Sequence, residues 1–223
     1  MSILPIVRLG HPALRGVAKA LPPERIGEAA IQELVDDMIE TMRAARGVGL
    51  AAPQVGTSLQ VFVYEIAPAP APPAGQTQEP APAPAGQASG PIPLRVVINP
   101  MLTPQSGELV YDWEGCLSIP DLRGLVPRHP AVRVRGLDRL GQPLDYVAAD
   151  FEARIIQHEF DHLNGVVFLD RMRDLKALAF REEWERYMAA GAEESSDPLA
   201  PPANLGNDEP AFAAAGPPAA PRE

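Results

Sequence analysis

The spacing of apolar and polar residues along the chain predicts a mixture of helices and strands. Between Ile31 and Met42 apolar residues recur every three or four positions, with acidic or polar residues between them. This spacing is typical of an amphipathic helix. The helix is expected to stop at Gly47, because the following GVGLAAPQVG is too rich in glycine and proline to continue it. That segment predicts a loop or a short extended stretch.

Short segments rich in β-branched and aromatic residues predict strands. These segments are residues 59–66, 94–98, 108–112, 131–137 and 143–148. The turn-like sequence DRLGQ separates the last two, which indicates an antiparallel meander.

Helical spacing returns in the second half of the chain. Apolar residues predict a second helix from about Phe151 to Leu163. A third helix is expected to begin near Asp174, a favourable N-cap residue, and to continue until just before Gly191. Strands and helices that occupy separate parts of a chain are typical of an α+β fold.

Proline is concentrated in two parts of the chain. Of the 27 prolines, nine lie in residues 67–93 and seven in residues 192–223, where the remaining residues are mostly Ala, Gly, Gln and acidic residues. Such segments do not form a packed core. We therefore predict one folded domain over residues 1–191, with a Pro/Ala-rich insertion at 67–93 and a disordered acidic tail at 192–223.

The net charge of −10 narrows the functional classes. Half of it comes from residues 192–223, and the rest of the chain shows no basic stripe, so we expect no direct binding of nucleic acid. No apolar run approaches the ~20 residues of a membrane span, and the first residues do not resemble a signal peptide, so we expect a cytoplasmic protein without membrane association. The only cysteine, Cys116, cannot form an internal disulfide.

The strongest chemical signal lies in the predicted second helix, in the sequence His158-Glu159-Phe160-Asp161-His162. A spacing of four places both imidazoles on one face of the helix, where they can bind one metal ion with Glu159 beside it as a general base. Two surface histidines beside a glutamate are the alternative interpretation. We favour metal binding, because the chain contains only four histidines.

A catalytic metal site usually requires a third protein ligand. The longer H-E-x-x-H-x-x-G-x-x-H pattern fails, because Phe168 stands at the last position. A glutamate of the third helix, Glu182, Glu183 or Glu185, could serve, but a solvated acidic helix face explains these residues better. Cys116 could serve as a soft thiolate ligand, although a lone cysteine is more often a buried hydrophobic residue. These residues by themselves leave the choice open.

Three segments resemble, in the same order, the three motifs of the peptide deformylase family. They are GVGLAAPQ at 47–54, EGCLS at 114–118 and HEFDH at 158–162. The opening VRLGHPALR and the segment ARIIQHEFDHLNG are also similar to that family. The resemblance implies antiparallel sheets packed around a central metal-binding helix, with an N-terminal amphipathic helix and a C-terminal helix.

The resemblance also implies an activity, the removal of the N-formyl group from the formylmethionine of nascent polypeptides with release of formate. It makes Cys116, His158 and His162 the metal ligands, with water as the fourth ligand and nucleophile. Fe²⁺ is the expected ion, and Zn²⁺, Ni²⁺ or Co²⁺ can replace it. Glu159 takes a proton from the water and later passes one to the departing amine.

Two groups are expected to stabilise the negative oxygen formed during the attack: the side-chain amide of Gln54 and the backbone N–H of Leu117. Without the other two motifs, Gln54 would be interpreted as a turn residue. The substrate-binding residues that the resemblance implies are Val48, Gly49, Gly115 and Ile155.

Three further residues lie close to the motifs. Glu114 and Arg123 flank the cysteine, and either an ion pair between them orders the loop or each is a plain surface charge. Arg154 precedes Ile155, and its stem is expected at the rim of the pocket for the methionine side chain.

Two alternatives to a deformylase remain open. One is an HExxH metallopeptidase with a glutamate as third ligand, and the other is a metal-containing binding protein without catalysis. The expected partners of a deformylase are N-formylmethionyl nascent peptides, which imply transient proximity to the ribosome.

Overall fold

A computed structural model describes residues 2–68 and 90–189. Its α-helices are α1 (Ala29–Ala44), α2 (Asp150–Leu163), α3 (Phe168–Arg171) and α4 (Arg181–Tyr187). Its strands are β1 (Gly49–Ala51), β2 (Val61–Ile66), β3 (Ile92–Pro104), β4 (Val110–Cys116), β5 (Ile119–Arg128), β6 (Ala131–Leu137), β7 (Pro143–Ala149) and β8 (Leu178–Phe180). Short 3₁₀ helices are η1 (Pro12–Leu14), η2 (Pro23–Arg25), η3 (Ala52–Val55) and η4 (Leu175–Ala177).

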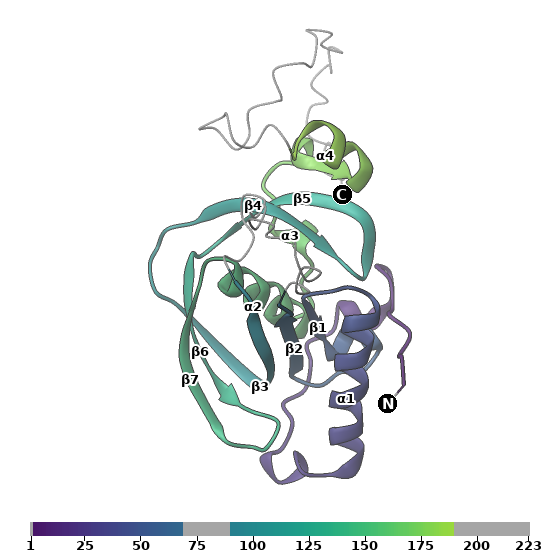
Figure 1. Cartoon of the computed structure of the whole chain (residues 1–223), viewed down its shortest axis with the longest axis vertical. Helices are drawn as coiled ribbons and strands as arrows, with labels where there is room; N and C mark the ends of the chain where they lie inside the picture. The colour runs from purple at the N-terminus through teal and green to yellow at the C-terminus, as the bar shows by residue number, and fades with distance from the viewer. Residues whose placement is uncertain (1, 69–89, 190–223) are drawn as a thin grey trace, which may run out of the picture.

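The described strands form two antiparallel sheets. One has five strands in the order β1-β2-β3-β6-β7, and the other has three in the order β4-β5-β8. Helix α2 lies in the middle of the molecule, between the large sheet and the β4–β5 hairpin, and α1 lies at one side (Figure 1). The expected combination of helices with antiparallel sheets is confirmed.

Strand β2, inside the large sheet, is buried on both faces. Along β2, Val61 and Val63 join the core cluster that contains the apolar residues of α1, whereas Phe62 and Tyr64 join the cluster that contains the apolar residues of α2. Successive side chains of a strand point to opposite faces, so a strand covered on both sides needs apolar residues at consecutive positions. This explains why residues 61–64 form an uninterrupted apolar run.

The predicted amphipathic helix is confirmed as α1, which is one turn longer than its apolar pattern. Met38 and Met42 are fully or almost fully buried on the face that covers the sheet. The backbone N–H of Gly47 donates to the carbonyl of Met42 at 2.9 Å and closes the C-terminal end of the helix. The glycine-rich segment that follows forms the short strand β1 and the 3₁₀ helix η3.

Strand β5 was not among the predicted strands. Pro120, Gly124 and Pro127 interrupt its apolar pattern, yet residues 119–128 pair with β4 along most of their length. The small sheet buries a third apolar cluster around Ile119, Val126 and Phe168. Pairing between strands therefore overrides weak local preference here.

The prediction of a continuous third helix is wrong. Asp174 caps only the short 3₁₀ helix η4, and residues 178–180 then extend as β8 and pair with Leu122–Gly124 of β5 before α4 begins. Backbone hydrogen bonds to the neighbouring strand replace those that a helix would make. The local apolar pattern carries no information about pairing with a distant strand.

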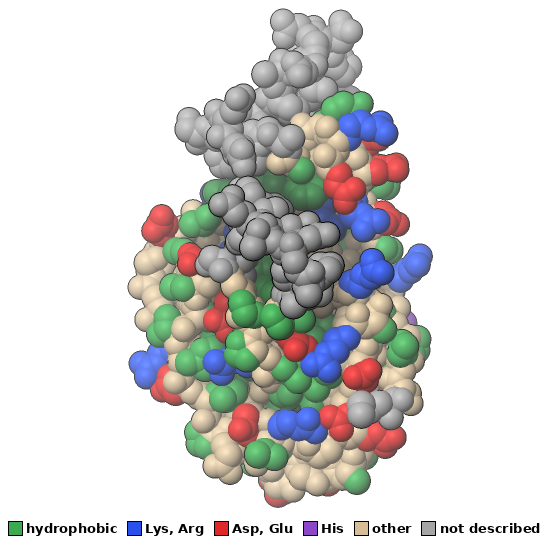
Figure 2. All heavy atoms as spheres, in the orientation of Figure 1, with side chains coloured by type: hydrophobic (Ala, Val, Ile, Leu, Met, Phe, Trp, Pro, Cys, Tyr) green, Lys and Arg blue, Asp and Glu red, His purple; other side chains and the backbone are tan. Residues whose placement is uncertain are grey.

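The predicted insertion and tail lie largely outside the described residues. Strand β3 begins at Ile92, one residue earlier than the expected end of the insertion at 93. Residues 69–89 and the tail 192–223 are not described. Within the described ranges, no helix combines the length and the apolar character that crossing a bilayer requires. In the described part of the face drawn in Figure 2, acidic and basic side chains are interspersed with hydrophobic ones.

A turn after α2 provides a test of the packing. Gly165 has φ of 71°, and a Cβ atom there would lie 2.6 Å from the carbonyl oxygen of Arg15. We expect Gly165→Ala to lower the free energy of unfolding by ~2 kcal/mol, because the side chain disfavours this backbone conformation and clashes with the opposing backbone. Urea unfolding measures the change. Gly107→Ala is the control, since nothing lies within 4 Å of its added Cβ, and an equal loss in both variants would contradict the prediction.

Candidate functional site

Helix α2 carries the two histidines of the H-E-x-x-H sequence on its inner side. Ile155 and Ile156 anchor the helix in the core cluster of the large sheet. This packing fixes the rotation of the helix, so that His158 and His162 lie one turn apart with ring centroids separated by 5.0 Å. His162 is completely buried.

Cys116 reaches the histidines from the other sheet. It ends strand β4, and its Sγ lies 3.3 Å from Nε2 of His162. One potential ligand atom from each of Cys116, His158 and His162 lies within 4.8 Å of the others. The fold therefore brings together the three residues that the resemblance implied as ligands.

This arrangement fits a transition metal. A thiolate with two imidazoles is a donor set that such ions prefer, and all three side chains are largely removed from water. Among the described residues, the buried Oε2 of Glu159 and the buried Nδ1 of His162 have no hydrogen-bond partner. Buried polar atoms normally have partners, so unsatisfied atoms at this point are consistent with a site that takes up a ligand.

Glu159 lies against the glycine of strand β1. A Cβ added to Gly49 would be 2.4 Å from Oε1 of Glu159, so no larger residue fits there without moving the carboxylate. Burial raises the pKa of Glu159 to about 7. A carboxyl group with this pKa can both accept and return a proton near neutral pH.

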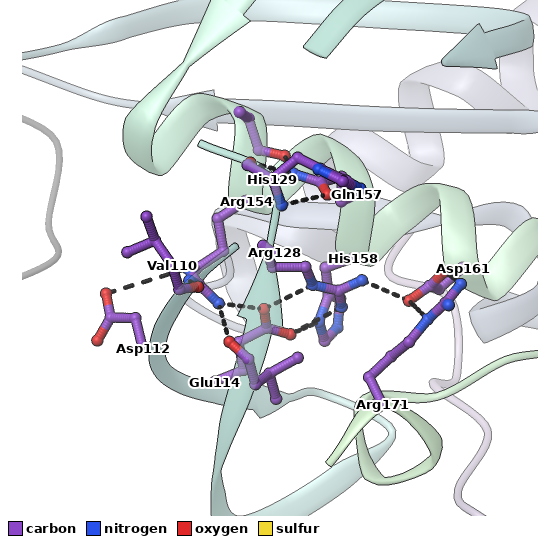
Figure 3. A network of polar contacts seen from close by, with 12 residues as sticks. Val110, Asp112, Glu114, Arg128, His129, Arg154, Gln157, His158, Asp161 and Arg171 are labelled. Carbon is purple, nitrogen blue, oxygen red and sulfur yellow. Dashed lines mark hydrogen bonds and ion pairs between the residues drawn. The ribbon is translucent and has the colours of Figure 1, made fainter. Parts of the chain in front are cut away.

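The carboxylate of Glu114 holds His158 in place (Figure 3). One oxygen accepts from Nδ1 of His158 at 2.9 Å, and the same carboxylate accepts from Nε of Arg128 at 2.9 Å and from Nη1 of Arg154 at 2.8 Å. Burial opposes ionisation, but Arg128 and His158 keep the pKa of Glu114 well below its usual range. An ionised Glu114 requires that Nδ1 of His158 carries the proton, which leaves Nε2 for a metal.

The network extends to the neighbouring turn of α2. Asp161 accepts from Arg128 at 2.6 Å and from Arg171 at 2.6 and 3.0 Å. Arg128 is thus shared between two buried carboxylates, and Figure 3 shows it between Glu114 and Asp161. No sequence pattern pointed to Arg128, because it lies at the end of β5, which local preferences do not predict.

The expected ion pair between Glu114 and Arg123 is wrong, because Glu114 is engaged by Arg128 and Arg154. The guanidinium of Arg123 lies over the ring of Trp184 in α4 at 5.9 Å. It also covers Gly115, where an added Cβ would lie 1.7 Å from Nη1 of Arg123.

Arg154 has a buried guanidinium and lies beside a cavity. Its guanidinium donates to the backbone carbonyls of Val126 and Val110 in the β4–β5 hairpin at 2.9 and 2.8 Å. Its side chain is one of those that line a cavity of about 580 Å³, together with Asp112 and Phe151. The charged group therefore points into the hairpin and not into solvent.

The two groups expected at the reacting oxygen also lie at the site. Gln54 is buried, its Oε1 accepts from the backbone of Ala51 at 2.8 Å, and its Nε2 lies 3.6 Å from Sγ of Cys116. Leu117 follows the cysteine in the β4–β5 turn, and its backbone N–H donates to no acceptor within the described residues. Both groups have a donor near the cysteine.

The residues expected to bind substrate lie in different environments. Gly49 lies at Glu159 and Gly115 lies under Arg123. Val48 is 39% exposed and lines a cavity of about 630 Å³, whereas Ile155 is buried in the core cluster of α2. Ile155 therefore does not line the cavity that Val48 borders.

The alternative glutamate ligands lie apart from the histidines. The described group of potential ligand atoms contains none of the glutamates of α4. Glu183 contacts Arg186 at 3.7 Å and Glu185 contacts Arg181 at 4.0 Å, as residues of a solvated helix face do.

Comparison with known proteins agrees with these observations. The model of the polypeptide deformylase family matches residues 3–178. The chain belongs to this family. The membership confirms the family resemblance and the enzyme class that it implied.

Relatives and solved structures cover most of the chain. It is 43% identical over 184 residues to peptide deformylase 2 of Nostoc sp., covering 82% of this chain and 94% of that protein. It is 38% identical over 180 residues to peptide deformylase 1 of Nitrosomonas europaea, covering 81% and 93%. A class I type b peptide deformylase of Acinetobacter baumannii, solved bound to Met-Ala-Ser, superposes with a TM-score of 0.64 at 34% identity, covering 77% of this chain and 100% of that one.

The shared role of Arg128 leads to a prediction about stability. We expect Arg128→Met to lower the free energy of unfolding by ~3–5 kcal/mol, because Glu114 and Asp161 stay buried and lose a shared partner. Arg133→Met is the matched control, since its pair with Asp145 is exposed and its loss should change stability little. Chemical denaturation compares the two variants, and similar losses would show that the buried network is not what stabilises the hairpin on α2.

Proposed function

We propose that this protein removes the N-formyl group from the N-terminal formylmethionine of nascent polypeptides and releases formate. The observation that carries the proposal is the convergence of Cys116, His158 and His162 within 4.8 Å beside the buried carboxylate of Glu159. In the polypeptide deformylase family, this combination supports hydrolysis of a formyl amide.

Cys116, His158 and His162 would hold one divalent metal ion, for which we propose Fe²⁺, with Zn²⁺, Ni²⁺ or Co²⁺ as substitutes. When bound, such an ion supplies Lewis acidity that polarises a carbonyl oxygen and makes water a nucleophile near neutral pH. Glu114 keeps the imidazole of His158 in the orientation and tautomer that a metal ligand needs, through its 2.9 Å contact with Nδ1.

Glu159 transfers the proton in this proposal. It takes a proton from the attacking water while the oxygen bonds to the formyl carbon, and it gives that proton to the amine nitrogen as the C–N bond breaks. The products are formate and a free amino terminus. Its pKa of about 7, raised by burial, suits both transfers.

Gln54 and Leu117 stabilise the oxygen that becomes negative during the attack. The side-chain amide of Gln54 is held by Ala51 and directed toward the cysteine, and the backbone N–H of Leu117 is available as a second donor. One such donor is typically worth ~3 kcal/mol of transition-state stabilisation.

The substrate is proposed to be the extended N-terminus of a formylated chain, which would bring the enzyme close to the ribosome during translation. The related protein of Acinetobacter baumannii was solved bound to Met-Ala-Ser. In the proposal, Val48, Gly49, Gly115 and Ile155 bind or border the first residues of the peptide. An HExxH peptidase with a glutamate ligand gains no support, because the glutamates of α4 are absent from the ligand group.

The reaction and the thiol can be tested together. Anaerobically purified protein should release formate from formyl-Met-Ala-Ser, whereas Cys116→Ala should lose both activity and most of its bound metal, because the ligand set is incomplete. Formate assay and metal analysis give the two readouts. Full activity in Cys116→Ala would contradict the proposed ligand set, and an inactive iron form beside a fully active zinc form would contradict the choice of Fe²⁺.

The proton transfer has a separate test. Glu159→Gln should lower kcat by about 10²- to 10⁴-fold, because the amide cannot accept the proton, while the metal content stays that of the wild type. Glu182→Gln, Glu183→Gln and Glu185→Gln, in helix α4, should each retain full activity, which would exclude all three as metal ligands. Metal analysis and formate release from the same preparations distinguish a lost proton acceptor from a lost metal.

A further inference from the structure

Residues 46–54 change from exposed to buried as the chain enters the site. Strand β1 is a terminal strand of the large sheet as described, so one of its edges is open to an added strand. Gly49 contacts the catalytic carboxylate, and Leu50 to Gln54 beyond it are buried. Val48 is 39% exposed and Arg46 is exposed. An extended peptide whose formyl group lies at Glu159 therefore meets exposed residues in the direction of Val48 and Arg46, and buried residues in the direction of Leu50 to Gln54.

A cavity lies at the end of this path. It has a volume of about 630 Å³ and is lined by Met42, Arg43, Arg46, Gly47, Val48, Glu65, Ile66 and Ala67. The chain turns at Arg46, so at ~3.3 Å per residue of extended strand Arg46 lies at most ~10 Å from Gly49. A peptide paired along this stretch brings its third or fourth residue to the cavity.

Two arginines line the cavity, and they differ in their ion pairs within the described residues. Arg43 is engaged by Glu65 at 2.7 Å and lies 3.7 Å from Glu40. Arg46 forms no ion pair within the described part of the chain. It also has φ of 54°, a conformation that a non-glycine residue adopts at a cost of ~1 kcal/mol. An arginine thus occupies a position whose backbone conformation favours glycine.

We propose that this cavity binds an acidic side chain at the third or fourth residue of the formylmethionyl peptide, with Arg46 as its partner. The proposal rests on the proposed deformylase function and adds a substrate preference to it. The apolar surfaces of Val48 and Ile66 accommodate the methylene groups of such a side chain, and a basic side chain meets the repulsion of Arg46.

Two series of amidated peptides test this preference, formyl-Met-Ala-X-Ala and formyl-Met-Ala-Ala-X, with Glu, Gln or Lys at X. We expect kcat/KM to decrease in the order Glu, Gln, Lys in at least one series, with a ratio of roughly fivefold between Glu and Lys at low salt, as for a partly exposed ion pair. The ratio should approach one in 0.5 M NaCl, because salt screens exposed charges.

Arg46→Gln should abolish the preference and Arg46→Glu should reverse it. Arg135→Gln, which removes an exposed arginine from strand β6, should leave it unchanged. Thermal unfolding of each variant checks that the fold is intact. Equal kcat/KM for Glu and Lys peptides in both series, or a preference that persists in Arg46→Gln, would overturn the inference while formate release remains. No formate from any peptide would instead refute the proposed function and the inference with it.

Discussion

The buried carboxylate of Glu114 is the interaction on which the organisation of the site depends. It comes from β4, and its partners come from β5 and α2, namely Arg128, Arg154 and His158. An isolated buried charge would cost several kcal/mol, so the carboxylate is stable only when the hairpin and the helix are packed together. The contact that orients a histidine for metal binding is thus the same contact that joins the small sheet to the central helix.

The three potential metal ligands come from different layers of the fold. Two imidazoles lie on α2, whose apolar face is fixed by the large sheet, and the thiol lies at the end of a strand in the small sheet. Neither sheet by itself contains all three. The proposed centre is complete only in the folded domain, and the glycines at 47 and 49 let the turn around Leu117 and the carboxylate of Glu159 approach β1 closely. Small residues at this edge therefore serve both packing and access.

The open edge of β1 connects the chemistry with the surface. Gly49, the first residue of the strand, lies against Glu159, and the residues just before it, 46–48, line the cavity beside Arg46. Positions along this short segment change steeply from buried to exposed, so an extended peptide beside it would have a buried end and an exposed end. An unfolded chain end suits such an edge, because pairing with strand backbone recognises an extended peptide whatever its side chains are, and the pockets provide the selectivity.

The sequence by itself determined the features that depend on local spacing. The apolar periods of α1 and α2 and the four-residue spacing of His158 and His162 follow from helix geometry, and the motif likeness pointed to Cys116, Gln54 and the family. Only the tertiary structure decided that β5 forms, that residues 174–187 break into three elements, and that Glu114 contacts Arg128 and Arg154 in place of Arg123. These depend on strand pairing and on charges shared between distant segments, whose free energy is set by partners that no local window of sequence contains.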